Sequence, residues 1–191
     1  MKATLSFLGQ RAIILHRPGD TTDRLVRQCV LLGFRAEARW EPVHVAERMD
    51  IVLVDADEGW DGLLPWAPAE RPVPLVALLA SEAPGRIAWA LDQGADALIA
   101  KPVAASAVYP ALVMATRRRA ETRELNERIL RLEERVRLRP LVHAAVQRFM
   151  AAYECSEDEA YGRLRREAMQ SRLTLEQAAA SILASSRRQA G

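Results

Sequence analysis

A heptad pattern over residues 108–139 constrains the fold of this chain more than any other feature. Positions that alternate three and four residues apart carry mostly apolar side chains over about four heptads, and the pattern is most regular in its second half. If Leu125 and Leu132 occupy position d, then Ile129 and Val136 occupy position a. β-Branched residues at a with leucine at d favour a parallel two-stranded coiled coil.

Two interpretations of this segment compete: a coiled-coil helix that pairs with a second chain, and an amphipathic helix that lies on its own domain. Charged residues cover the other helix faces, and the remaining apolar stripe is too narrow for a helix that packs against a globular core. Arg128 falls at position g and Glu133 at the following e, where they are placed for an interchain ion pair. We therefore predict a dimerisation helix over residues 108–139, with contacts from Leu125, Ile129, Leu132, Val136, Arg128 and Glu133.

Composition limits the remaining choices. The chain has 191 residues, half of them hydrophobic, and a net charge of +2, so it has room for one or two domains and is not polybasic overall. Cys29 and Cys155 have neither metal-ligand spacing nor a disulfide framework, which fits a reducing compartment. No apolar run approaches the roughly 18 residues of a membrane span, and the N-terminus lacks a signal-peptide layout. We expect a cytoplasmic protein without a membrane partner, metal or cofactor.

The segment before the heptads predicts an α/β domain. Its short, continuous apolar runs are typical of parallel strands that are buried on both faces. We expect strands at residues 12–15, 36–40, 50–55, 74–79 and 97–100, and helices that include residues 25–32 and 87–91. Thr21, Thr22 or Asp23 is expected to cap the first helix. Together these elements predict a flavodoxin-like, doubly wound, five-stranded parallel sheet over residues 1–107.

Asp55 and Lys101 each stand at the carboxyl end of a predicted strand. Ligands of doubly wound sheets bind beyond the carboxyl ends of the strands, so we expect these two side chains to face each other there. Residues 50–55 and residues 93–102, which end in a Lys-Pro dipeptide, resemble the receiver domains of bacterial response regulators. This resemblance implies that Asp55 matches the phospho-accepting aspartate of that family and Lys101 its partner.

The receiver-like segment departs from its family where receivers bind Mg²⁺. His16 and Arg17 replace the acidic pair that holds the ion in receivers. Mg²⁺ requires several oxygen ligands, and phosphoryl transfer depends on the charge that the metal supplies. We therefore interpret the domain as a pseudo-receiver in which Asp55 pairs with Lys101 or Arg17. The alternative is a regulator that is controlled by phosphorylation of Asp55.

Residues 140–191 predict a small all-α domain of three helices. Pro140 is expected to interrupt or bend the long helix that precedes it. Ser156 with Glu159, and Thr174 with Gln177, form two capping boxes that start the second and third helices. The inner faces of these helices are rich in alanine, which allows close packing of their backbones.

The C-terminal pattern resembles the ANTAR domain, the RNA-binding module of AmiR- and NasR-type transcription antitermination regulators. The matching residues are Ala145, Met150, Ser156-Glu157-Asp158-Glu159-Ala160, Tyr161, Leu164-Arg165-Arg166-Glu167-Ala168-Met169, Arg172, Leu175, Ala179 and Ile182. The degenerate receiver and Trp40-Glu41-Pro42 make the chain more similar to the AmiR type, in which a bound sensor protein exerts control. The resemblance implies a homodimeric antiterminator that binds structured leader RNA, with a ligand-sensing repressor of periplasmic-binding type as partner.

Arginines are the candidate RNA contacts, since Val146 and Ala152 replace two basic residues of the family pattern. The candidates are Arg148, Arg163, Arg165, Arg166 and Arg172. For any one of them the alternative is a solvated charged face, and the alternative function is a protein-interaction adaptor that has lost RNA binding. Tyr153 is a candidate for stacking on a base, whereas Tyr161 is expected in the core. No catalytic nucleophile with its base is visible, so we do not predict an enzyme.

Overall fold

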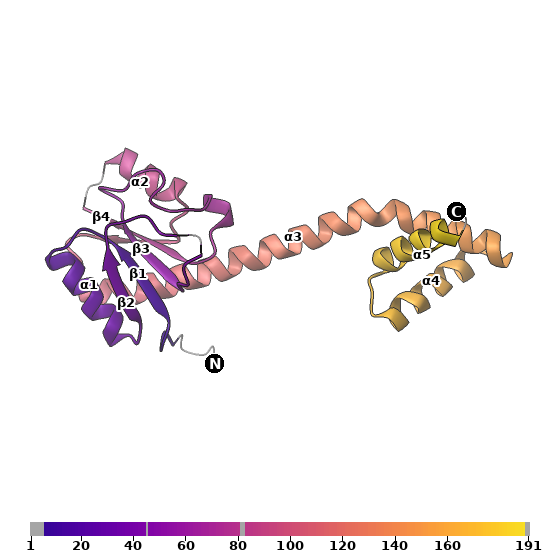
Figure 1. The fold of residues 1–191 in the computed structure, drawn as a ribbon, viewed down its shortest axis with the longest axis horizontal. Coiled ribbons are helices and arrows are strands. Elements are labelled where there is room, and N and C mark those ends of the chain that lie inside the picture. Colours follow the sequence, from indigo (N-terminus) through magenta and orange to yellow (C-terminus); the bar gives the residue numbers. More distant parts are fainter. Residues whose placement is uncertain (1–5, 45, 81–82, 190–191) are drawn as a thin grey trace. The chain divides into compact units, whose positions relative to one another are not determined.

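The computed structural model describes residues 6–44, 46–80 and 83–189. The chain divides into two compact units, Met1–Arg123 and Glu124–Gly191, which are described separately below. The long helix α3 (Ala105–Tyr153) contributes residues to both units (Figure 1).

The first unit contains a five-stranded parallel sheet with the strand order β2-β1-β3-β4-β5. The strands are β1 (Arg11–Leu15), β2 (Arg35–Arg39), β3 (Ile51–Asp55), β4 (Leu75–Leu79) and β5 (Ala97–Ala100). Strands β3 and β4 are buried over their whole length, as expected of the continuous apolar runs that form them. The strand order reverses between β1 and β3, which is the flavodoxin-like doubly wound topology predicted from the sequence.

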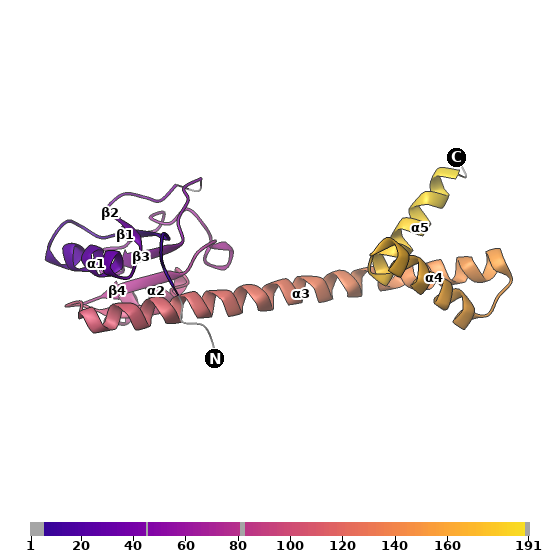
Figure 2. The ribbon, with the colours of Figure 1, turned by 90° about the horizontal axis from the view of Figure 1, so that it is seen from below.

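The two faces of the sheet are covered differently. Helix α1 (Asp20–Leu31) and the first turns of α3 cover one face, where Leu25 and Cys29 meet Val108 and Leu112 in a common core. The other face is covered by α2 (Pro84–Asp92) and by irregular segments that include the short 3₁₀ helix η1 (Pro68–Glu70) (Figures 1 and 2). Within the described residues, the connections from β2 to β3 and from β3 to β4 contain no α-helix.

The start of α1 differs from the prediction. The helix begins directly after Gly19 and no side chain caps it, so the predicted cap by Thr21, Thr22 or Asp23 is wrong. The reason is that α1 starts at Asp20, which places all three residues inside its first turn. The Thr22 hydroxyl instead donates a hydrogen bond to the carbonyl oxygen of Arg17 over 2.5 Å.

The fold divides the predicted dimerisation segment into a buried and an exposed part. Three early heptad positions lie in the core of the first unit: Val108, Ala111 and Ala115. For this part, the prediction of an intermolecular seam is wrong, because these residues pack against the chain's own sheet. The later seam residues Leu125, Ile129, Leu132 and Val136 are between 50% and 71% exposed. An apolar seam that is open to a second chain therefore begins at Leu125.

The second unit packs the C-terminal part of α3 against α4 (Glu157–Ser171) and α5 (Leu175–Gln189) (Figure 2). Its centre is formed by Ala145 of α3, Ala160 and Leu164 of α4, and Ala179 of α5, all of which are fully buried. The small alanine side chains let the three helices approach closely, so this short segment of chain still encloses a core.

Both predicted capping boxes are present in the second unit. The Ser156 hydroxyl accepts a hydrogen bond from the Glu159 backbone, and the Glu159 carboxylate accepts one from the Ser156 backbone. Thr174 and Gln177 form the same reciprocal pair before α5. By contrast, α3 continues through Pro140, so the predicted interruption is wrong. The alternative, a bend at this residue, stays a prediction. A proline inside a helix removes one backbone hydrogen bond but leaves φ at a helical value.

Candidate functional site

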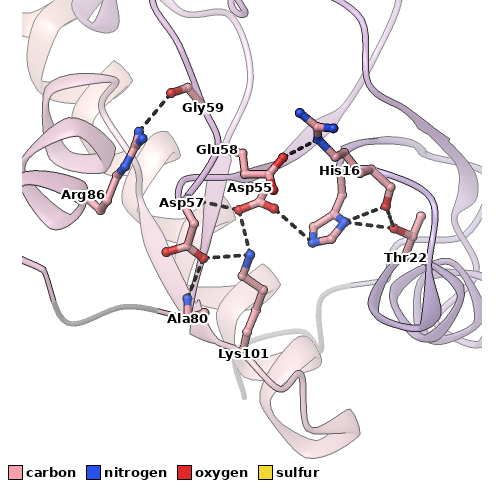
Figure 3. A network of polar contacts seen from close by, with 10 residues as sticks. His16, Thr22, Asp55, Asp57, Glu58, Gly59, Ala80, Arg86 and Lys101 are labelled. Atoms are coloured by element: carbon pink, nitrogen blue, oxygen red, sulfur yellow. Dashed lines mark hydrogen bonds and ion pairs between the residues drawn. The ribbon is translucent and has the colours of Figure 1, made fainter.

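Asp55 lies at the carboxyl end of β3 and is 3% exposed. Lys101, the first residue after β5, places its Nζ 2.7 Å from Asp55 Oδ1 (Figure 3). The same ammonium group lies 2.7 Å from Asp57 Oδ2. The predicted meeting of Asp55 and Lys101 at the carboxyl edge of the sheet is therefore confirmed, and one cation serves two carboxylates there.

His16, the first residue after β1, approaches Asp55 from another side than Lys101 (Figure 3). Its Nε2 lies 3.2 Å from Asp55 Oδ2, an ion-pair distance, although the two groups lack hydrogen-bond alignment. Its Nδ1 lies 2.8 Å from the carbonyl oxygen of Arg17, which holds the ring in place. His16 therefore closes the side of Asp55 that Lys101 leaves open.

Arg17 does not pair with Asp55, so this alternative of the predicted pairing is wrong. Its guanidinium instead pairs with Glu58 and lies 6.0 Å from the centre of the Trp40 ring. Trp40 in turn meets Trp60 edge to face, with ring centres 5.2 Å apart. These contacts direct the Arg17 side chain outward, away from the Asp55 carboxylate that was its predicted partner.

Asp57 is the site residue that sequence reasoning missed. Its carboxylate accepts a hydrogen bond of 2.7 Å from the backbone N–H of Ala80, and its own N–H donates to Asp55 Oδ1 over 3.0 Å. The sequence did contain a signal for Asp57. It follows the end of β3 by two residues, which keeps it at the edge of the sheet where Lys101 lies. Burial alone would lower the pKa of Lys101, but hydrogen bonds from its ammonium to Asp55 and Asp57 outweigh burial and raise that pKa.

These residues do not fit the Mg²⁺ ion that a receiver fold implies. Mg²⁺ takes a near-octahedral set of oxygen ligands, whereas one oxygen of Asp55 and one of Asp57 are already bound to an ammonium group. His16 and Arg17 supply no side-chain oxygen after β1. Within residues 6–44, 46–80 and 83–189, no group of three His, Cys, Asp or Glu side chains is arranged to hold a metal ion.

The candidate RNA-binding arginines of the second unit are exposed, but they do not lie on one surface. Leu164 is buried, and the side chains of its two neighbours leave α4 on opposite flanks. Arg165 lines a groove between α3, α4 and the start of α5, with a volume of about 940 Å³. On the other flank, the guanidinium carbon of Arg163 lies 4.5 Å from the centre of the Tyr153 ring.

The groove combines charged and apolar walls. Arg135, Arg139 and Arg165 line it, together with Tyr161, and Arg135 Nε lies 3.4 Å from a carboxylate oxygen of Glu176. Tyr161 is 45% exposed, so its predicted place in the core is wrong. The reason is its position at the edge of the buried face of α4. The groove could therefore receive a ligand that carries both negative charge and flat apolar groups.

The other three candidates are also exposed: Arg148, Arg166 and Arg172. Arg172 ends α4 in the left-handed conformation, with φ of 54°. Such a residue stops a helix: the Arg172 N–H donates a hydrogen bond to the Met169 carbonyl oxygen, and the N–H of Leu173 donates one to the Ala168 carbonyl oxygen. Arg172 therefore has a role in the fold whether or not it touches a ligand.

Comparison with known proteins identifies both units. The AmiR N-terminal family model matches residues 10–116, and the ANTAR domain model matches residues 130–183. The aliphatic amidase regulator of Pseudomonas aeruginosa is 28% identical over 166 residues, which cover 85% of each chain. The transcriptional regulatory protein PdtaR of Mycobacterium tuberculosis is 30% identical over 149 residues, which cover 75% of this chain and 72% of PdtaR.

Solved structures agree with the fold. The response regulator StyR is similar with a TM-score of 0.56 and 14% identity, over 91% of this chain and 100% of that one. Among the described residues, no helix has the length and apolar character needed to cross a membrane. One family model covers more than half of the chain, and the relatives are regulators of transcription. The chain therefore belongs to the AmiR-type transcription antitermination regulators, in which a receiver-like domain is joined to an RNA-binding ANTAR domain.

Proposed function

We propose that this chain acts as a homodimer that binds a structured leader transcript and prevents formation of a terminator hairpin. In this proposal residues 1–107 form a pseudo-receiver, the exposed seam of α3 from Leu125 to Val136 pairs two chains, and residues 140–191 form the RNA-binding domain. A bound ligand-sensing repressor of periplasmic-binding type, rather than phosphorylation of Asp55, controls the activity.

One observation carries the proposed form of control: Asp55 is enclosed by nitrogen groups of its own chain. Lys101 holds one of its oxygens and His16 faces the other, and the surrounding residues do not fit Mg²⁺. Phosphoryl transfer depends mainly on positioning and on charge neutralisation by the metal. Without that ion, a signal has to reach the domain by another route, and binding of a second protein provides one.

The proposed dimer rests on the exposed part of the seam. Ile129, Leu132 and Val136 line a shallow, almost wholly apolar hollow of about 390 Å³ on α3. A helix that presents such a stripe gains most of its stability from packing of that stripe against another element. A second copy of the chain fits this surface, because Arg128 and Glu133 then lie at complementary g and e positions.

The proposed RNA binding rests on the exposed arginines of the second unit. Arginine side chains bind phosphate oxygens, often with two hydrogen bonds, and the charge makes binding dependent on salt. One observation favours the protein-interaction adaptor instead: Val146 and Ala152 stand at positions where the family carries basic residues. Val146 is only 3% exposed, so it contributes packing to the core rather than charge to the surface.

The test is a salt titration of binding to the 5′ leader transcript of the operon that encodes this chain. Each phosphate contact that is lost in Arg165→Ala, Arg166→Ala or Arg172→Ala should reduce the logarithmic salt slope by roughly 0.7 to 0.9. Circular dichroism serves as the folding control, which matters most for Arg172 because this residue ends α4. If the wild-type chain binds no transcript of its own operon, the adaptor becomes the better description.

A further inference from the structure

We propose that Tyr153 and Arg163 form a platform on which one unpaired RNA base stacks. The inference rests on the proposed RNA binding and assigns it a contact that is separate from the groove around Arg165. The Arg163 guanidinium carbon lies 4.5 Å from the centre of the Tyr153 ring, and that ring is 55% exposed. A guanidinium group thus lies over an aromatic ring at the surface, next to solvent.

The fold holds the two groups of this platform in place before any ligand arrives. Tyr153 is the last residue of α3 and meets Phe149 edge to face, with ring centres 5.7 Å apart. The chain then turns through Glu154, which has a φ of 49°, and the Ser156 capping box starts α4. Tyr153 is therefore in contact with Phe149 of α3 and with Arg163 of α4, two helices that pack in the same core. Little side-chain freedom would be lost when a base binds.

The chemistry of the platform suits a nucleobase. Unpaired bases in RNA loops stack on aromatic rings and on guanidinium planes, and a positive charge nearby attracts the phosphate that follows the base. Two acidic residues of α4 lie one turn from Arg163, Glu159 before it and Glu167 after it. The Glu159 carboxylate accepts hydrogen bonds from the N–H and hydroxyl groups of Ser156, which lower its pKa, and the charge of Arg163 lowers it further. Among the described residues neither carboxylate forms an ion pair with Arg163, so the guanidinium can still contact a ligand.

The platform should accept different bases. Every base has a π face, and stacking selects weakly between them when no polar groups read their edges. We therefore assign this surface to the affinity of RNA binding. Selection of sequence then falls to other contacts, such as those in the groove.

The experiment uses the full chain and the leader transcript of its own operon, with each loop adenine replaced in turn by 2-aminopurine. Binding is measured for wild type, Tyr153→Ala, Tyr153→Phe and Arg163→Lys, and Gln170→Ala is the matched control, because Gln170 is exposed on the same helix and is not one of the candidate RNA contacts. Tyr153→Ala should bind roughly five- to 150-fold more weakly, which corresponds to the loss of one stacked base. Its salt slope should stay unchanged, because no charge is removed.

The conservative variants separate stacking from charge and from folding. Tyr153→Phe retains the ring and should bind within about twofold of wild type. Arg163→Lys retains the charge but loses the planar group, so affinity should fall without a change in salt slope. One 2-aminopurine position should be quenched by wild type and by Gln170→Ala, and less by Tyr153→Ala and Arg163→Lys.

The outcomes distinguish this inference from the proposed function. If wild type binds the transcript and Tyr153→Ala and Arg163→Lys bind it equally well, the platform is rejected and RNA binding stands. If wild type binds no transcript of its operon, the proposed function fails and the platform fails with it. If Tyr153→Ala loses its helical circular dichroism, the decision passes to Arg163→Lys, which leaves the contact between Tyr153 and Phe149 in place.

Discussion

Lys101 and Asp55 form an almost buried ion pair that joins the carboxyl ends of β5 and β3, with Nζ and Oδ1 2.7 Å apart. Their side chains are 14% and 4% exposed, so water screens the pair only weakly. Asp57 shares the same ammonium group. Removal of the lysine would leave two neighbouring carboxylates without this cation.

The first prediction is that Lys101→Met lowers the free energy of unfolding by about 3–5 kcal/mol, the usual cost of breaking a buried pair by removing one partner. Urea unfolding of the purified chain measures the change. Arg17→Ala is the matched control, because the Arg17–Glu58 pair at the same edge is exposed and should contribute at most about 1 kcal/mol. Equal effects of the two substitutions would contradict the assignment of Lys101 as the stabilising cation.

The second prediction concerns the pH dependence of this stabilisation. The pKa of Lys101 is raised in the folded chain, since hydrogen bonds to Asp55 and Asp57 outweigh the effect of burial. The stabilising contribution should therefore be fully present below the ordinary lysine pKa and lost as pH rises through the raised value. The difference in unfolding free energy between wild type and Lys101→Met should narrow above about pH 10.5. A constant difference across that range would show that the charge of Lys101 is not its source.

The third prediction is that a small phosphodonor with Mg²⁺ does not measurably phosphorylate Asp55. The carboxylate is held by Lys101 and faced by His16, and its surroundings do not supply the oxygen ligands that Mg²⁺ needs. Intact-mass measurement after incubation with acetyl phosphate checks this, with Asp55→Asn as the control. A stable mass increase that is absent from Asp55→Asn would establish the phosphorylation-controlled alternative.

Four of the strands could be predicted to within a residue or two because their apolar runs are continuous and are bounded by glycine, proline or charged residues, whereas β2 was predicted from alternating apolar residues. The meeting of Asp55 and Lys101 followed from the same pattern, since parallel strands bring their carboxyl ends to one edge. The contact of His16 could not be predicted in this way. The direction of its side chain depends on the conformation of the loop after β1, where Thr22 bonds to the Arg17 carbonyl rather than capping α1.

The second unit shows a similar division. The capping boxes were visible because they are local patterns of three or four residues. The separation of Arg163 and Arg165 onto two flanks depends on which face of α4 is buried against α3 and α5, and that is a property of packing. Pro140 is the opposite case. Proline alone predicts an interruption of the helix, but the turns of α3 on both sides of Pro140 are helical and the helix continues through it.

The fourth prediction concerns the reactivity of the two cysteines. Burial raises the pKa of the Cys29 thiol to about 12, so almost none of it is thiolate at neutral pH. Cys155 is partly exposed at the turn before α4. Ellman's reagent should therefore label one thiol rapidly in the native chain and two in urea, and Cys155→Ser should remove the rapid phase. Two rapid thiols in the native wild type would contradict the burial of Cys29.

The last prediction tests the seam on α3. Replacement of Ile129 and Leu132 by Asp places charges where a second helix would pack, and apolar side chains cannot solvate them. Sedimentation velocity should show wild type as a dimer and the Ile129→Asp/Leu132→Asp variant as a monomer. Leu130→Asp is the matched control, because Leu130 is 65% exposed but falls at position b, outside the seam.

The charges beside the seam test the orientation of the two chains. In a parallel pair, Arg128 at g meets Glu133 at the following e of the partner helix. Arg128→Glu alone places like charges together and should weaken the dimer, whereas Arg128→Glu with Glu133→Arg restores opposite charges and should recover much of the loss.

A dimer that survives the aspartate substitutions would show that the chains associate elsewhere. If Leu130→Asp also dissociates it, the contact surface is wider than the heptad pattern defines. A failure of the charge exchange alone would leave the seam in place but argue against the parallel arrangement.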